Sequence, residues 1–343
     1  MKRKNFLATL FASFGSVGLF GQSNWILSEL NEESTLTRKP PYLRPGDTIA
    51  IVSPAGFISV EDIQPAIKKL EEWGYKIMIG NSVGKRDFTF GGTDVERLQD
   101  FQTMLDNDEV KAILCARGGY GIIRIVDQIN FNKYSRFPKW IIGFSDATIL
   151  HSHINRNCRI ATIHSKMCNS FPQDWSLAED MQKVSINSIQ ETLIGKKLIY
   201  TANANQSNRL GNSSGELIGG NMRCIENLAG TKSDIITRNK ILFLEDTDEY
   251  LYNIDRMFWN LKRTGKLSHL KGLIIGGFKT KKDDEGEEFG KTLEEIVMEK
   301  VREYQYPVCF DFPVGHQKYN IALQSGSTHS LEVDKDGVTL KNI

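Results

Sequence analysis

The chain has 343 residues, more than one ordinary globular domain contains, so two domains of roughly 150 residues are expected. Lys and Arg together number 43 and Asp and Glu 42, which leaves a formal net charge of +1. That balance provides no basic field for a phosphate backbone, so no nucleic acid partner is expected. Hydrophobic residues at 40% and charged residues at 25% are typical of a folded protein, and we expect an enzyme.

The first 40 residues differ from the rest of the chain. A basic stretch over residues 2–4 precedes an uncharged run over residues 6–21, and a polar segment follows. This layout predicts a signal peptide, because the run is shorter than the roughly 20 residues of a transmembrane helix. We therefore assign residues 1–40 to a leader and polar segment, and expect an exported, periplasmic protein. A cytoplasmic location is the alternative, because an odd number of cysteines would leave a free thiol in an exported chain.

The cysteines predict neither disulfides nor a metal centre. They are scattered and contain no C-x-x-C pair, so we expect buried small apolar side chains. A site built from His151, His153, His164 and Cys158 is the only metal alternative, and no zinc-ligand spacing supports it. We expect no metal and no cofactor. The five cysteines are Cys115, Cys158, Cys168, Cys224 and Cys309.

Short apolar strands alternate with helices over residues 41–170. This alternation predicts a parallel sheet covered on both faces by helices, a flavodoxin-like α/β domain. Functional groups in such sheets gather beyond the carboxyl ends of the strands. The expected strands are 48–53, 75–80, 110–116 and 139–144, and the expected helices are 59–73, 93–105 and 120–129.

A second α/β domain, smaller than the first, is expected over residues 215–343. Before it, a helix near residues 176–193 leads into residues 201–215, which are small, polar and without apolar periodicity. We interpret that stretch as a linker and assign residues 171–214 to a connecting segment. In the second domain we expect strands at 215–221, 240–245 and 272–278, helices from 222, across 254–261 and near 291–304, and a hairpin turning at Asp336-Gly337.

Residues 139–154, KWIIGFSDATILHSHI, run from an apolar strand through Gly143-Phe144-Ser145-Asp146-Ala147 into a helix. This corner is close to the G-x-S-x-G nucleophile elbow, in which small flanking residues let a sharp turn project the serine hydroxyl outward. The helix that follows aims its free N–H groups at the same point, so the Asp146 backbone N–H is a candidate oxyanion donor. The alternative is that Ser145 only caps the helix.

A serine nucleophile needs a base, and His316 is the best candidate among six histidines. It follows an apolar strand and Gly315, where a loop would present it to a cleft. His151 and His153 lie on the helix after the elbow and are expected to be surface or packing residues. His164 ends an apolar run near the cleft, and its role stays open.

The base in turn needs a carboxylate, and Glu245 with Asp246 ends the apolar run ILFLED. A charge at the end of a buried strand is costly without a partner, so a partner is expected. Ser145, Glu245 and His316 then follow the order serine, acid, histidine that other triads use. An acidic turn that merely caps the next helix is the alternative.

A glycine cluster, CARGGYG, follows another buried strand. Gly118 and Gly119 let backbone N–H groups approach a ligand, so Gly119 is a candidate for the second oxyanion donor. The cluster lacks the Lys-Ser/Thr pair of a phosphate loop. Arg117 beside it is a candidate for binding a substrate carboxylate, with a salt-bridging surface residue as the alternative. The sequence GGNM at residues 219–222 is interpreted as a tight turn.

These motifs together resemble the LD-carboxypeptidases, serine peptidases of family S66, across nearly all of residues 41–343. The resemblance implies an N-terminal domain with the nucleophile and a C-terminal domain with the acid and histidine, roles that fall on Ser145, Glu245 and His316. It also implies backbone oxyanion donors, placed at Asp146 and Gly119, and a homodimer. The matching motifs are RPGDTIAIVSPAG, FGGTDVERLQDF, ARGGYG, GFSDAT, GGNM, FLEDTDEYLYNIDRMFWNL and PVGHQKYNIALQSGS.

The resemblance further implies an activity. Members release the terminal D-alanine of murein (peptidoglycan) tetrapeptides through an acyl-enzyme, and related members inactivate peptide-nucleotide antibiotics. A murein tetrapeptide or related small peptide is therefore the expected partner. An exported peptide or sugar binding protein and an inactive cell-wall protein are the other classes. Two features depart from the family: Gln324 replaces the usual Pro in N-x-x-L-P-x-G, and the leader is unusual for enzymes that recycle murein in the cytoplasm.

Overall fold

The structure is a computed structural model that describes residues 37–343. The uncharged run of the expected leader, residues 6–21, lies outside the described residues. No helix within residues 37–343 combines the length and apolarity needed to cross a membrane.

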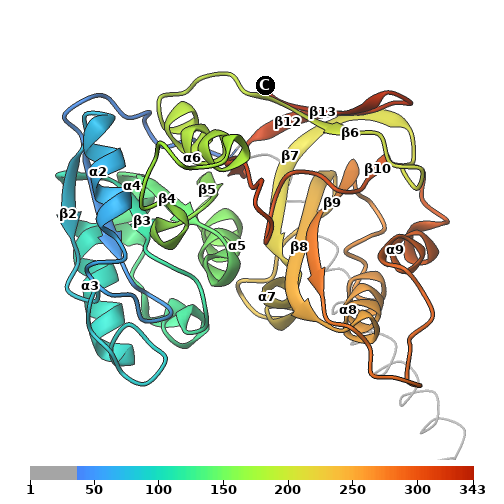
Figure 1. The fold of residues 1–343 in the computed structure, drawn as a ribbon, viewed down its shortest axis with the longest axis horizontal. Helices are drawn as coiled ribbons and strands as arrows, with labels where there is room; N and C mark the ends of the chain where they lie inside the picture. The colour runs from blue at the N-terminus through green and yellow to red at the C-terminus, as the bar shows by residue number, and fades with distance from the viewer. Residues whose placement is uncertain (1–36) are drawn as a thin grey trace, which may run out of the picture. The chain divides into compact units, whose positions relative to one another are not determined.

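The N-terminal half is built on a six-stranded sheet (Figure 1). Its first five strands run parallel, as the alternation of strands and helices predicts. The edge strand β11 (Leu323–Ser325) is antiparallel to β5 and comes from the far end of the chain. The order is β11-β5-β4-β3-β1-β2, with β1 (Thr48–Val52), β2 (Lys76–Ile79), β3 (Val110–Cys115), β4 (Trp140–Gly143) and β5 (Thr162–His164).

Helices cover both faces of this sheet, each through its own apolar cluster. On one face, residues of α2 (Gln64–Glu72) and α6 (Asp180–Leu193) pack against the sheet, among them Leu70 and Ile189. On the other face lie α3 (Asp94–Asp106), α4 (Asn132–Arg136) and α5 (Thr148–Asn157). The expected α/β fold class is therefore confirmed for this half.

Two of the expected helices differ from the prediction. The helix expected over 59–73 begins only at Gln64, because Ser59 and Asp62 hydrogen-bond to each other's backbone in a preceding turn. The helix expected over 120–129 is instead two 3₁₀ turns, η2 (Ile122–Arg124) and η3 (Val126–Gln128). Buried apolar side chains lie at 122, 125, 126 and 129, the i, i+3, i+4, i+7 spacing of an α-helix, which is why the sequence pattern predicted one continuous helix.

The C-terminal half is a seven-stranded mixed sheet of order β10-β9-β8-β7-β12-β13-β6. Four strands are parallel, and the last three add an antiparallel extension that contains the expected hairpin. The strands are β6 (Ile199–Asn203), β7 (Gly211–Asn221), β8 (Lys240–Glu249), β9 (Gly272–Thr280), β10 (Val308–Cys309), β12 (Thr328–Val333) and β13 (Gly337–Asn342).

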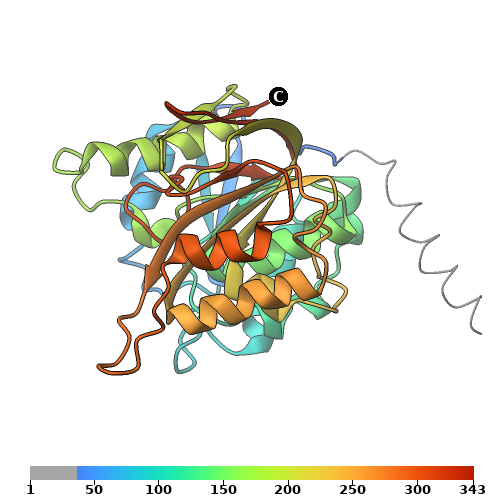
Figure 2. The same cartoon turned by 90° about the vertical axis from the view of Figure 1, so that its right-hand side faces the viewer.

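Three helices pack on the parallel part of this sheet: α7 (Met222–Asn227), α8 (Leu251–Arg263) and α9 (Leu293–Val301). Figure 2 shows α8 and α9 side by side against one face of the strands. The apolar stripe expected on α8 is confirmed, because Ile254, Met257, Phe258 and Leu261 are all buried.

The linker expected over 201–215 is wrong, because the segment holds most of β6 and the start of β7. β6 is an edge strand whose side chains are mostly exposed, so it shows no apolar alternation in the sequence. Its backbone pairs with β13, far along the chain. The segment 171–214 is thus divided: α6 packs on the first sheet, and β6 belongs to the second.

Candidate active site

Ser145 follows the carboxyl end of β4 and begins a 3₁₀ turn that leads into α5. Its φ is 60°, a strained value for a residue with a side chain. Gly143 is small by necessity, because a Cβ there would lie 2.9 Å from the Cβ of Ala147. No side chain caps α5, so the alternative that Ser145 serves as a helix cap is wrong. The corner has the geometry of an elbow that presents a hydroxyl.

The glycine loop lies directly against this serine. A Cβ built on Gly118 would lie 2.9 Å from Ser145 Cβ and 3.0 Å from Ser145 Oγ. Gly119 has φ 108°, which glycine adopts without strain. The Asp146 carboxylate accepts a hydrogen bond of 2.8 Å from the Ile122 N–H and so links the elbow to the end of this loop.

Asp146 is itself an unusual group. Its side chain is buried, and burial raises its pKa to about 6, although the hydrogen bond from Ile122 and the charge of Arg97 act in the opposite direction. Arg97 is fully buried nearby and donates to the carbonyl oxygens of Pro54 and Gly121. The buried Arg97 thus links the loop that follows β1 to the glycine loop that lies against the elbow.

His316 and Glu245 form a hydrogen-bonded pair, with 2.5 Å between His316 Nδ1 and Glu245 Oε2. Glu245 lies in β8 and its side chain is fully buried, whereas the His316 side chain is 18% exposed. Gly315 permits the approach, because it has φ 103° and a Cβ there would lie 2.3 Å from Glu245 Cβ. The prediction that Glu245 ends its strand is wrong, because β8 continues to Glu249, but the expected partner of this buried carboxylate is present and is His316.

The environment of His316 favours its charged form. Burial acts to lower the pKa of the imidazole, but the hydrogen bond and charge of Glu245, together with the charge of Asp246, outweigh burial and raise it. The ring of Phe144, the residue before Ser145, lies 4.9 Å from the His316 ring. The His316 to Glu245 pair therefore lies beside Phe144, the residue that precedes Ser145 at the elbow.

Asp246 and Asn221 have structural roles that the sequence reading missed. Asp246 accepts hydrogen bonds of 2.9 Å from Asn221 Nδ2 and from the Arg223 N–H, and burial raises its pKa to about 6. The Asn221 backbone N–H donates to Thr148 Oγ1 at 3.0 Å, at the first residue of α5. Gly219 to Asn221 form the end of β7 and not a turn, and this strand end ties the acidic strand β8 to the elbow helix α5. An Asn directly before a helix was the available signal, because its side chain caps α7.

Of the remaining histidines on the elbow helix and β5, His151 and His153 have hydrogen-bond partners of their own, and neither ring nitrogen of His164 has one within the described structure. His151 Nε2 lies 2.9 Å from the Gly143 carbonyl oxygen, and His153 Nδ1 lies 2.8 Å from Ser233 Oγ. His164 is buried against Phe144 and Phe243, and burial holds its pKa well below the usual value. Within the described part of the chain, no cluster of three His, Cys, Asp or Glu side chains is arranged to hold a metal.

Arg117 stands at the exposed edge of the glycine loop, where its Nη1 donates to the Phe57 carbonyl oxygen at 2.9 Å. Lys166, which the sequence analysis did not consider, lies near the elbow, with its Nζ 5.6 Å from the centre of the Phe144 ring. Its Nζ donates to the carbonyl oxygen of Gln317, the residue after His316.

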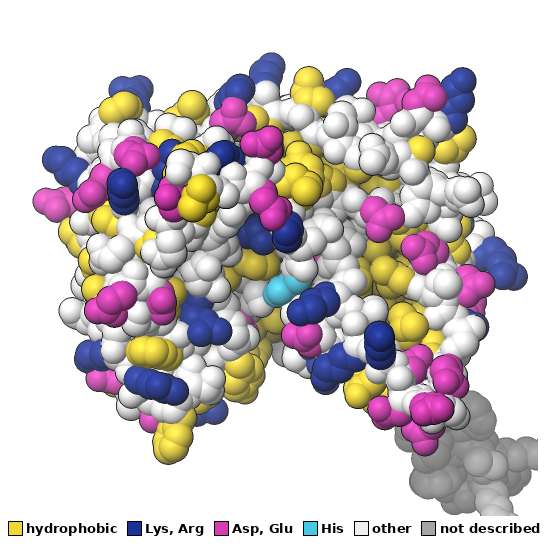
Figure 3. Space-filling view, viewed as in Figure 1, with side chains coloured by type: hydrophobic (Ala, Val, Ile, Leu, Met, Phe, Trp, Pro, Cys, Tyr) yellow, Lys and Arg dark blue, Asp and Glu magenta, His cyan; other side chains and the backbone are white. Residues whose placement is uncertain are grey.

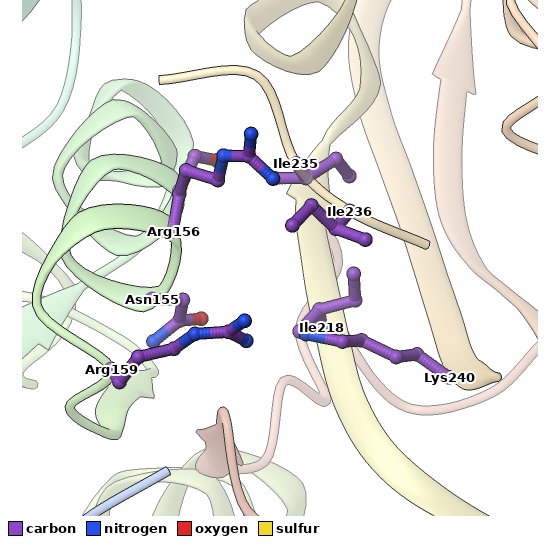
Figure 4. Close-up of a pocket in the computed structure, with 8 residues that line it drawn as sticks. Asn155, Arg156, Arg159, Ile218, Ile235, Ile236 and Lys240 are labelled. Atoms are coloured by element: carbon purple, nitrogen blue, oxygen red, sulfur yellow. The ribbon is translucent and has the colours of Figure 1, made fainter. Parts of the chain in front are cut away.

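Figure 3 shows a hollow between the two halves, with a histidine surface at its floor and Lys and Arg side chains at its margin. Another small pocket lies elsewhere on the same seam, between α5 and β7, and contains none of the three proposed catalytic residues (Figure 4). It is lined by Ser152, Asn155, Arg156, Arg159, Ile218, Ile235, Ile236 and Lys240.

Comparison with known proteins agrees with this architecture. Residues 49–165 match the LD-carboxypeptidase N-terminal domain of peptidase family S66, and residues 214–331 match its C-terminal domain. A Bacillus subtilis (strain 168) protein named "Probable murein peptide carboxypeptidase" is 33% identical over 299 residues, 87% of this chain and 92% of that protein.

Solved structures share the fold. The muramoyltetrapeptide carboxypeptidase from Oxalobacter formigenes superposes with a TM-score of 0.76 at 25% identity, covering 86% of this chain and 98% of that one. The microcin C7 self-immunity protein MccF superposes with a TM-score of 0.77 at 22% identity, over 89% and 98% of the two chains. With both family domains matched in order, the chain belongs to the LD-carboxypeptidases, the serine peptidases of family S66.

Proposed function

We propose that this enzyme hydrolyses the L,D-peptide bond to the terminal D-alanine of murein tetrapeptides, with Ser145, His316 and Glu245 as its triad. The observation that carries the proposal is the His316 to Glu245 hydrogen bond, set beside a serine held at φ 60°. The names of the B. subtilis and O. formigenes relatives support the substrate class.

In the proposed reaction, His316 takes the Ser145 proton through its Nε2 while Glu245 holds the Nδ1–H. The Ser145 oxygen attacks the scissile carbonyl carbon, and the backbone N–H groups of Asp146 and Gly119 stabilise the oxyanion. His316 then gives the proton to the leaving amine of D-alanine. Water, activated by the same imidazole, releases the acyl group from Ser145.

The strain and burial at the site argue for catalysis over simple binding. A binding protein would gain nothing from a serine held at positive φ or from a buried carboxylate hydrogen-bonded to a mostly buried imidazole, because both arrangements are costly. Such features persist where the surrounding structure supports a chemical role. This reasoning favours the hydrolase over an exported peptide or sugar binding protein.

Export of the protein and a homodimer are further parts of the proposal. The basic stretch at 2–4 and the uncharged run at 6–21 support export, and the family resemblance supports the homodimer. Fractionation of the native host tests the location, and a cytoplasmic protein with an intact N-terminus would overturn it. Sedimentation of the purified chain tests the dimer.

The central test incubates the full chain and its S145A variant with disaccharide-free murein tetrapeptide and follows the loss of one alanine by mass spectrometry. Wild type should release D-alanine and S145A should be slower by roughly 10³-fold to 10⁶-fold. S152A is the matched control, because Ser152 is a buried serine of α5 whose Oγ has no hydrogen-bond partner within the described structure. An S145A protein with full activity would refute the proposal.

A further inference from the structure

A carboxypeptidase must distinguish a chain end from an internal peptide bond, and the free carboxylate marks that end. The group that binds this carboxylate is not part of the triad. This inference rests on the proposed function and concerns how the same site selects its substrate.

The position of the carboxylate is limited by the chemistry. His316 must reach the leaving nitrogen, and in the leaving amino acid only the Cα separates that nitrogen from the carboxylate carbon. Standard bond lengths place the two atoms about 2.5 Å apart. The cation that binds the carboxylate must therefore lie beside His316, and not on the opposite wall of the cleft.

Lys166 meets this requirement. It lies two residues beyond the end of β5 and is partly buried. Its Nζ donates to the Gln317 carbonyl oxygen at 2.7 Å and lies 5.6 Å from the centre of the Phe144 ring. The same ring lies 4.9 Å from the His316 ring, so Lys166 and His316 share one aromatic neighbour.

The Lys166 ammonium has N–H groups that make no hydrogen bond within residues 37–343. An ammonium carries three N–H donors, and across residues 37–343 the structure records one hydrogen bond and no ion pair for this one. Burial lowers the Lys166 pKa, and the charge of Glu245 raises it in part. A half-buried cation without a carboxylate at its side is costly, and an anionic ligand would offset that cost.

The other cations of the described cleft are less suitable. Arg117 belongs to the glycine loop, on the side of the oxyanion donors, and its guanidinium donates to Phe57. Arg124 pairs with Asp94, and Arg223 lies beside Glu226. Lys318 is 73% exposed and pairs with Glu179 at 2.7 Å. Lys166 alone among them combines partial burial, proximity to His316 and the lack of an acidic partner.

We propose that the Lys166 ammonium binds the C-terminal carboxylate of the peptide substrate and determines specificity for a free acid over an amide. The carbonyl oxygen of Gln317 fixes the ammonium, and its remaining N–H groups bind the carboxylate.

The test compares one tetrapeptide as its free acid and as its C-terminal D-alaninamide, using the full-length chain. Wild type should prefer the acid. K166M should raise KM for the acid by about 10-fold to 100-fold, the range expected for a lost charge-assisted hydrogen bond, and should leave kcat/KM for the amide unchanged. K166R should keep part of the preference. K318M, which changes an exposed lysine two residues after His316, is the matched control.

A merely structural role for Lys166 predicts a different result. If K166M slows both substrates equally, the ratio of kcat/KM for the acid to that for the amide stays at the wild-type value. Lys166 then only supports the loop that carries His316, and the inference is overturned. If R117M abolishes the ratio while K166M does not, the carboxylate binds at the glycine loop, and the inference is likewise overturned.

A binding measurement separates this inference from the proposed function. Calorimetric titration of S145A and of S145A combined with K166M, with acid and amide peptides, needs no turnover. A preference of S145A for the acid that disappears in the double variant supports the role of Lys166, even if wild type cleaves neither peptide. Equal affinities of S145A for acid and amide would overturn the inference while leaving D-alanine release by wild type as separate support for the triad.

Discussion

Glu245 and His316 are 71 residues apart in the chain, yet the carboxylate of one lies 2.5 Å from the imidazole of the other. Glu245 belongs to β8, and the bridge between Gly277 and Gly315 fixes the start of the histidine loop beside β9. The contact therefore follows from the pairing of neighbouring parallel strands. Because Nδ1 is held by Glu245, Nε2 is the nitrogen that the proposed mechanism assigns to the serine.

The fall of kcat/KM at low pH, the acid limb of the pH profile, should depend on the contact between Glu245 and His316. The proposed base must be neutral, and its pKa is raised, so wild-type kcat/KM should fall as pH drops through a value above 6.5. E245Q removes the charge that raises the pKa and leaves the burial that lowers it, so the limb should move to lower pH. The maximal rate should fall by roughly 10²-fold to 10⁴-fold.

D-alanine release between pH 4 and 9 provides this measurement. E249Q is the control, because Glu249 ends the same strand, lies 3.9 Å from Arg223 and does not contact His316. An acid limb at the same pH in wild type and E245Q would assign it to another group.

G118A should disable the enzyme and leave it folded. The added methyl would lie about 3 Å from Ser145 Oγ, so the serine or the glycine loop must shift. A displacement near 1 Å at a reacting group costs about 10²-fold in rate. The free energy of unfolding should fall by roughly 1–3 kcal/mol, as for other overpacked sites. Activity and urea denaturation check both expectations.

G286A is the matched control for that variant. Gly286 has φ 82° and no atom within 4 Å of an added Cβ, so the substitution strains the backbone without touching the site. Its stability should fall by about 1 kcal/mol at unchanged activity. If G118A retains wild-type activity, the glycine loop does not constrain the serine.

R97M should lower both the free energy of unfolding and the rate of the enzyme. The Arg97 side chain is fully buried and donates to the Pro54 and Gly121 carbonyl oxygens; the Pro54 oxygen would lose this hydrogen bond, whereas Gly121 would keep the one from the Arg124 N–H. Removal of a buried hydrogen-bonded cation typically costs roughly 3–5 kcal/mol. Urea denaturation measures this loss, and R86M, at an exposed arginine, should stay within about 0.5 kcal/mol of wild type. Equal stability of R97M and wild type would contradict the role of Arg97.

His329 should make the fold sensitive to acid. Burial lowers its pKa to about 4 from an ordinary value of 6.5, with the hydrogen bond to Ser327 opposing burial and the charge of Lys39 reinforcing it. The unfolded chain therefore binds more protons between these values, and stability present above pH 6.5 is lost as pH falls toward 4. Between pH 7 and pH 4, the free energy of unfolding should fall less in H329Q than in wild type, by on the order of 1–3 kcal/mol.

Denaturation of both proteins at several pH values measures that difference. Asp146 and Asp246, whose pKa values burial raises to about 6, act in the opposite direction over the same range. Both groups remain in H329Q, so their contribution cancels in the comparison. Parallel pH dependences of wild type and H329Q would show that His329 does not titrate with unfolding.

The sequence was sufficient to propose Ser145, Glu245 and His316 together, because each lies in or just after an apolar run with a small residue or an acid beside it, and the structure pairs two of them, Glu245 and His316. Those signals are local. What could not be predicted depends on contacts between distant segments: β6 is a strand only because β13 pairs with it, and β11 joins the first sheet only through β5. Lys166 gave no signal, since its partner Gln317 is 151 residues away.

Strand β11 has a consequence for how the enzyme can move. The loop that carries His316 begins at the Gly277 to Gly315 bridge in one sheet and ends at β11, whose Leu323 pairs with His164 in the other. A hinge motion that parted the two sheets would move the two attachment points of this loop, the Gly277 to Gly315 bridge and β11, away from each other. It would thereby separate His316 from Glu245. Opening would therefore break the contact on which the proposed reaction depends, so we expect substrate and product to pass through a cleft of nearly constant width. The two halves should also melt together, in a single calorimetric transition.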